Sequence, residues 1–115
     1  MRNLDAVRER YMRDSPAVRL GGLAADLARI KSFSNHPEHR DLVGSLLEES
    51  KFFIEWTAPD ADLTVQAELV ELQILLAGWH CRWNSIWADG AELRSVADSA
   101  QRWSNRILEI SGLLA

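Results

Sequence analysis

The chain has 115 residues, of which 47% are hydrophobic and 26% charged, and these values are typical of one soluble globular domain spanning residues 1–115. Its formal net charge at pH 7 is −4, and nine acids lie between residues 38 and 71 against only Arg40 and Lys51. Phosphate binding needs a concentrated basic face, so this acidic middle argues against nucleic acid as a partner.

Capping residues predict two helices in the first third of the chain. Asn3 is a suitable N-cap for a short helix over residues 4–13. Ser15 followed by Pro16 is a cap with proline in the first turn, and predicts a second helix that ends near residue 33.

Three further helices are predicted in the remainder of the chain. Pro37 begins the third, and the segment TAPDAD separates it from a long fourth helix over residues 62–88. Asp89 with Glu92 three residues later is a capping-box pattern for a fifth helix, which ends near Gly112. No segment alternates as a strand would, so the predicted class is all-α.

The fourth and fifth predicted helices each carry an apolar seam with alternating steps of three and four residues. Helices bury such seams by packing nearly antiparallel at a shallow angle. When the two helices fold back on each other about the Asp89–Gly90 link, each seam residue of one helix meets the seam residue of the other that is equally distant from the link. The predicted pairs are Ile86 with Leu93, Trp83 with Val96, Trp79 with Ala100, and Leu76 with Trp103.

The second and third predicted helices pair in the same way about the break near Pro37. The pairs are Leu20 with Phe53, Leu23 with Ser50, Leu27 with Leu46, and Ile30 with Val43. Beside this seam Gly21, Ala24, Ala25 and Ala28 form a small-residue edge, where another helix can approach closely. The predicted architecture is an antiparallel four-helix bundle made of two αα-hairpins, with a short N-terminal helix added.

Two apolar faces are left over by this pairing. One is a second stripe on the fourth helix, and the other is Phe52 with Trp56 on the third helix. The N-terminal helix, through Leu4, Val7 and Tyr11, can cover one of them. The alternative is that two copies of the chain pair as a symmetric homodimer. The N-terminal stripe is too short for both faces, so we favour a homodimer. The second stripe of the fourth helix consists of Leu63, Ala67, Val70, Ile74, Ala77 and Cys81, and the predicted interface residues are Phe52, Trp56, Val70, Ile74 and Ala77.

No motif points to catalysis, to a metal or to a cofactor. His36 and His39 form an H-x-x-H pair, but a zinc site needs three or four ligands. Cys81 lies on an apolar stripe, where we expect a small buried side chain rather than a reactive thiolate. The paired carboxylates lie on polar faces, away from any expected dry pocket. Asp60 and Asp62 are interpreted as charges at the start of the fourth helix.

The segment WHCRW at residues 79–83 raises an alternative. We interpret Trp79 and Trp83 as core residues, two of the five tryptophans of the chain. Together with His80 they can also form a site for a small aromatic or tetrapyrrole ligand. The single cysteine, the charged N-terminal segment and the absence of a long apolar run lead us to expect a cytoplasmic protein without a membrane span. The leading interpretation is a non-enzymatic helical interaction module, acting as a homodimer or on an unidentified protein partner.

Overall fold

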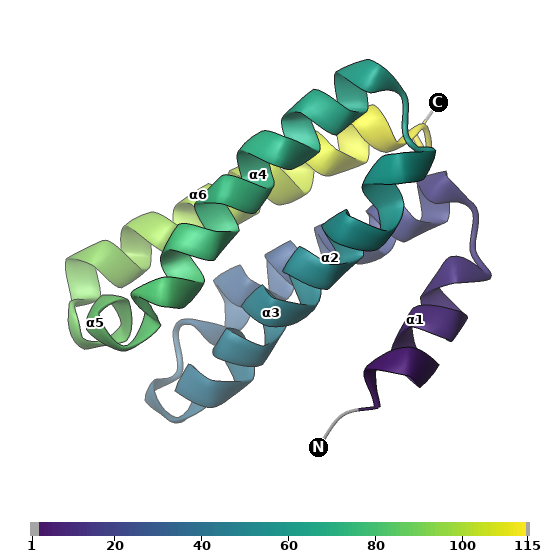
Figure 1. The fold of residues 1–115 in the computed structure, drawn as a ribbon. Coiled ribbons are helices and arrows are strands. Elements are labelled where there is room, and N and C mark those ends of the chain that lie inside the picture. Colours follow the sequence, from purple (N-terminus) through teal and green to yellow (C-terminus); the bar gives the residue numbers. More distant parts are fainter. Residues whose placement is uncertain (1–2, 115) are drawn as a thin grey trace.

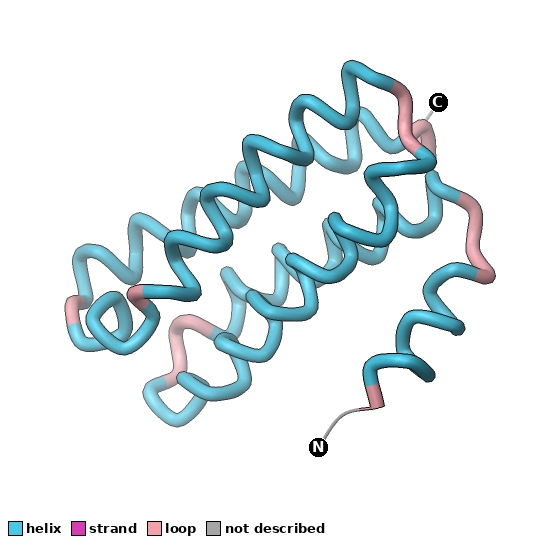
Figure 2. Tube along the Cα trace, in the orientation of Figure 1, coloured by secondary structure: helices cyan, strands magenta, loops and turns pink. Residues whose placement is uncertain are grey.

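The computed structural model describes residues 3–114 and shows them as six α-helices and two short 3₁₀ turns (Figure 1). Between residues 3 and 114 there is no strand, so the predicted all-α class is confirmed (Figure 2). The α-helices are α1 (Leu4–Met12), α2 (Pro16–Phe33), α3 (Arg40–Thr57), α4 (Leu63–Cys81), α5 (Trp83–Ala88) and α6 (Gly90–Ser111). The 3₁₀ turns, η1 (Pro37–His39) and η2 (Ala58–Asp60), lead into α3 and away from it.

The predicted helix starts are confirmed at three caps. The side chain of Asn3 accepts from the Ala6 amide, and Ser15 accepts from the Val18 amide. Asp89 accepts from the amides of Ala91 and Glu92 at the start of α6. Each cap satisfies a backbone N–H that has no partner inside its helix, and this fixes where the helix begins.

The prediction of one continuous helix over residues 62–88 is wrong. The helix breaks at Arg82, whose backbone angles of φ −104° and ψ 18° are not helical, and α5 follows as a separate short helix. Beyond the break the Trp83 indole N–H donates to the Arg40 carbonyl at 2.9 Å, and Ile86 is fully buried. The apolar spacing continues unchanged through residue 82, so the pattern contains no signal for the break.

Helix α2 lies at the centre of the fold and packs most extensively against α6, and next against α3. The small-residue edge of α2 is confirmed as a place of close helix approach, because the Ser104 hydroxyl of α6 reaches the Ala24 carbonyl at 2.7 Å. The sequence instead predicts the fourth helix as the main neighbour of α6. The alanines of this edge let the α2 backbone come close to α6, whereas the α4 backbone approaches α6 closely at few points.

The inner seam of α4 is buried as predicted. Leu69, Leu72 and Leu76 have no exposed surface. Trp79 and Trp83 are each 7% exposed, which confirms them as core residues.

Helix α1 is attached to α3 through Tyr11. The Tyr11 ring stacks on Phe53 with 4.0 Å between centroids. Its hydroxyl donates to the Arg19 carbonyl at 2.8 Å, so the Thr57 hydroxyl, 2.9 Å away, donates to the Tyr11 oxygen. Helix α1 therefore covers the side of α3 and not the second stripe of α4.

Candidate interaction surface

The outer stripe of α4 contains three of the large apolar side chains that are exposed among the described residues. Leu63 is 80% exposed, Ile74 70% and Val70 56%, and Ala67, Ala77 and Cys81 beside them are also exposed. We use the name outer stripe for Leu63, Ala67, Val70, Ile74, Ala77 and Cys81. Single exposed apolar residues are common on soluble proteins, whereas a contiguous apolar row is a candidate site for contact with a protein, a membrane or a ligand.

The two flanks of α4 explain why the outer stripe points into solvent. On one flank Gln66 donates to the Ala58 carbonyl at 2.8 Å and Gln73 to the Lys51 carbonyl at 3.2 Å, so this neutral row is tied to α3 and η2. On the other flank Glu68 accepts two hydrogen bonds from Arg106 of α6, at 2.6 and 2.8 Å. With the inner seam in the core, the remaining face of α4 has no neighbour within residues 3–114.

The second leftover face, Phe52 and Trp56 on α3, is half-buried in the structure. The two rings stack with 5.5 Å between centroids, and Trp56 also meets the Tyr11 ring at 5.9 Å. Helix α1 therefore takes up part of this face. Of the five predicted interface residues, Val70, Ile74 and Ala77 are exposed on one helix, whereas Phe52 and Trp56 form a separate, partly covered cluster.

Cys81 and Asp60 differ from their interpretation in the sequence. Cys81 is exposed and not buried, because its side of α4 has no covering helix. Asp60 does more than charge the start of α4: its carboxylate lies 2.7 Å from the guanidinium of Arg19, a buried arginine of α2. This ion pair joins η2 to the start of α2.

The residues of the ligand alternative surround no enclosed cavity. An open hollow of about 630 Å³ lies where α3 faces the end of α4, and His80, Cys81 and Trp83 are among its lining residues. Trp79 is not part of this lining. The His80 Nδ1 atom lies 3.4 Å from the Lys51 ammonium, so a neighbouring side chain already occupies one side of the imidazole. Binding of an aromatic or tetrapyrrole ligand here stays a prediction.

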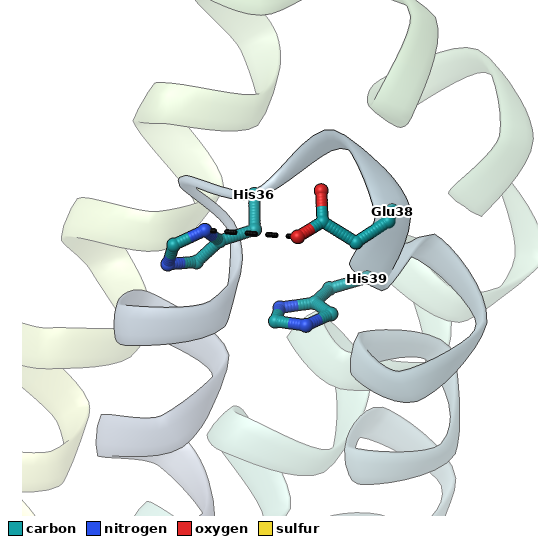
Figure 3. Close-up of side chains that lie close together, drawn as sticks. All are labelled: His36, Glu38 and His39. Carbon is teal, nitrogen blue, oxygen red and sulfur yellow. Dashed lines mark ion pairs between the residues drawn. The ribbon is translucent and has the colours of Figure 1, made fainter.

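The turn before α3 brings together three groups that could hold a metal ion. Each of His36, Glu38 and His39 offers one ligand atom, and these atoms all lie within 4.8 Å of one another (Figure 3). The Nδ1 atom of His36 is 3.9 Å from the Glu38 carboxylate. Two imidazoles and one carboxylate suit zinc with water in the remaining position. The H-x-x-H pattern in the sequence includes only the histidines; Glu38, two residues after His36 in the H-P-E-H segment, is a further candidate ligand that this pattern omits.

A buried carboxyl group lies between α2 and α3. Asp26 is 2% exposed and pairs with Arg29 at 3.0 Å. Burial, together with the neighbouring Glu49 carboxyl group, raises the pKa of Asp26 to about 8. Its position directly before the seam residue Leu27 was the available signal in the sequence. Asp26 is buried in the packing between α2 and α3, so its ionisation is coupled to folding.

Comparison with protein-family models, with curated proteins and with solved structures finds no match to this chain. Within residues 3–114 no helix has the length and apolar character needed to cross a membrane. The function of the chain is therefore inferred from its exposed surface.

Proposed function

We propose that this chain is a non-enzymatic helical interaction module that associates with a second copy of itself through the outer stripe of α4. Its scaffold is an antiparallel four-helix bundle of two αα-hairpins, α2 with α3 and α4 with α6, to which α1 is added. The observation that carries the proposal is the exposure of Leu63, Val70 and Ile74 in one row on a helix whose other sides are all anchored.

Burial of this row would be favourable. Each exposed Val, Leu or Ile side chain gains about 1.5–3 kcal/mol when it is removed from water completely. Polar residues border the row, including Glu71 and Gln66, as expected of an interface with an apolar centre and a polar rim. A charge placed in the centre of the row would have to be desolvated without a partner, and this gives a sharp test.

Sedimentation velocity across micromolar concentrations tests the proposal. We expect the wild-type chain to show a concentration-dependent monomer–dimer equilibrium. Ile74→Glu is expected to shift it to monomer with unchanged helical circular dichroism. Val18→Glu is the matched control, because Val18 is also exposed, at 45%, but lies on α2 away from the outer stripe. A wild-type chain that stays monomeric, or equal dissociation by both variants, would contradict the proposal.

A further inference from the structure

The geometry points to one register for this dimer: two α4 helices lie antiparallel, with the two-fold axis beside position 72. The inference rests on the proposed function, and adds to it which residue of one copy meets which residue of the other. A symmetric dimer uses the same patch on both subunits, so a residue and its partner must lie at equal distances from the axis.

The outer stripe is symmetric about position 72. Val70 and Ile74 are each two residues from it, Ala67 and Ala77 five residues, and Leu63 and Cys81 nine residues. When two copies lie antiparallel about this point, Val70 meets Ile74, Ala67 meets Ala77, and Leu63 meets Cys81 of the other copy. Every member of the stripe then faces another member, and none faces a polar residue.

The spacing and sizes of these residues fit a close helix–helix contact. The steps along the stripe alternate between four and three residues, which is the repeat of a helix that packs along its length against another. Aliphatic side chains lie at the centre of the stripe, and the small residues Ala67, Ala77 and Cys81 lie farther out. Gly78, on the border of the stripe, has no atom within 4 Å of the place where a Cβ would be. Small residues let two helix backbones approach closely.

Charges at the ends of α4 favour the antiparallel over the parallel arrangement. Asp62 and Arg82 flank the helix, are both exposed, and are each ten residues from position 72. In the antiparallel dimer Asp62 of one copy lies level with Arg82 of the other, at both ends of the helix pair. In a parallel dimer Asp62 would lie level with Asp62 of the other copy, and Arg82 with Arg82. Like charges repel, so this arrangement is less favourable. Arg82 also pairs with Glu92, but a guanidinium has five N–H donors and can serve both carboxylates.

The size of the contact predicts a reversible dimer. Helix α4 has 19 residues and is therefore about 28 Å long. One helix pair of this length buries less than the roughly 1,200–2,000 Å² of a standard stable interface. We expect monomer and dimer to coexist at micromolar concentrations.

Disulfide cross-linking tests the register, because Cys81 is the only cysteine of the chain. In Leu63→Cys the new thiol meets Cys81 of the other copy. Mild oxidation is expected to give a covalent dimer in which position 63 of each copy is linked to Cys81 of the other, as identified by peptide mass. A link within one chain is excluded, because positions 63 and 81 are about 27 Å apart along the helix and a disulfide needs Cα atoms within about 7 Å. Position 63 is 80% exposed, so the variant should fold like the wild type.

Two single-cysteine proteins are the matched controls. In the antiparallel register the two Cys81 residues of a wild-type dimer lie about 27 Å apart. The two thiols at position 63 in the double variant Leu63→Cys/Cys81→Ser are separated by the same distance. Neither is expected to cross-link. Cross-linking of both controls would indicate a parallel dimer and overturn the register. A dimer in sedimentation without links between position 63 and Cys81 would overturn the register but leave the proposed function standing. A monomer in sedimentation would overturn both.

Discussion

The two faces of α4 carry the same apolar spacing but differ in their surroundings. The inner face, with Leu69, Leu72 and Leu76, is completely buried in the chain's own core. The outer face, with Val70 and Ile74, is more than half exposed. The residues differ in size as well: leucine and tryptophan fill the interior, whereas alanine, valine and cysteine predominate outside. Periodicity thus specifies that a face is apolar, and the available neighbours decide whether the same chain covers it.

The largest contrast between the two faces should appear in monomer stability. Trp79→Ala removes a large buried side chain and is expected to lower the free energy of unfolding by about 3–5 kcal/mol. Ile74→Ala on the outer face should change it by no more than about 0.5 kcal/mol. Urea unfolding at concentrations below dimer formation measures both. Similar losses in the two variants would mean that the outer stripe is covered within the monomer.

Residue spacing is informative about α4 because its inner seam follows a regular repeat. Helix starts were predictable for a similar reason, since caps such as Ser15 and Asp89 satisfy local backbone groups. The break at Arg82 was not, because the apolar spacing runs through it unchanged, and the Trp83 contact that follows the break is with a carbonyl of α3, remote in sequence. The outer stripe itself was predictable, but its exposure depended on where α1 packs. Tyr11 directs α1 to α3 through contacts that the sequence pattern does not specify.

The buried carboxyl group of Asp26 should make the free energy of unfolding depend on pH, whereas it should not affect dimer formation through the outer stripe. In the unfolded chain Asp26 ionises near its ordinary pKa of 3.8, whereas in the folded chain its pKa is about 8. Between these values the folded state keeps a proton that the unfolded state loses, so the free energy of unfolding falls as pH rises and levels off above pH 8. Asp26→Asn should reduce this fall and stabilise the fold at pH 8 by about 1–3 kcal/mol.

Chemical denaturation at several pH values between 5 and 9 measures the effect of Asp26. The dimer dissociation constant, measured over the same range, should be equal in the wild type and in Asp26→Asn, because Asp26 lies between α2 and α3. A wild-type stability that rises with pH across this range would contradict the assignment.

Weakening the attachment of α1 should have a smaller effect on the free energy of unfolding. This attachment matters for the second leftover face, Phe52 and Trp56, because α1 covers part of it. Tyr11→Phe keeps the ring on Phe53 but removes the hydroxyl that joins the Arg19 carbonyl and Thr57. We expect a loss of about 1 kcal/mol in the free energy of unfolding. Leu4→Ala, at a partly exposed position of the same helix, should cost less. An unchanged stability in Tyr11→Phe would mean that α1 is not held by these hydrogen bonds.

The smallest effect concerns Glu71, which is exposed beside the outer stripe and one residue from position 72. In the antiparallel register the two Glu71 side chains of a dimer lie close together near the axis. Like charges at such a distance cost about 0.2–0.5 kcal/mol, so Glu71→Gln should tighten the dimer by about twofold. Glu55→Gln removes an exposed glutamate of α3, away from the axis, and should have no effect.

Mixing experiments sharpen this last contrast, because only a dimer of identical chains brings Glu71 to Glu71. A mixture of wild type with Glu71→Lys should form heterodimers in preference to either homodimer, as opposite charges then meet near the axis. Native mass spectrometry of the mixture gives the three populations directly. A statistical distribution at low salt would place Glu71 away from the axis. The stripe would then pair in another register even though its spacing is symmetric about position 72.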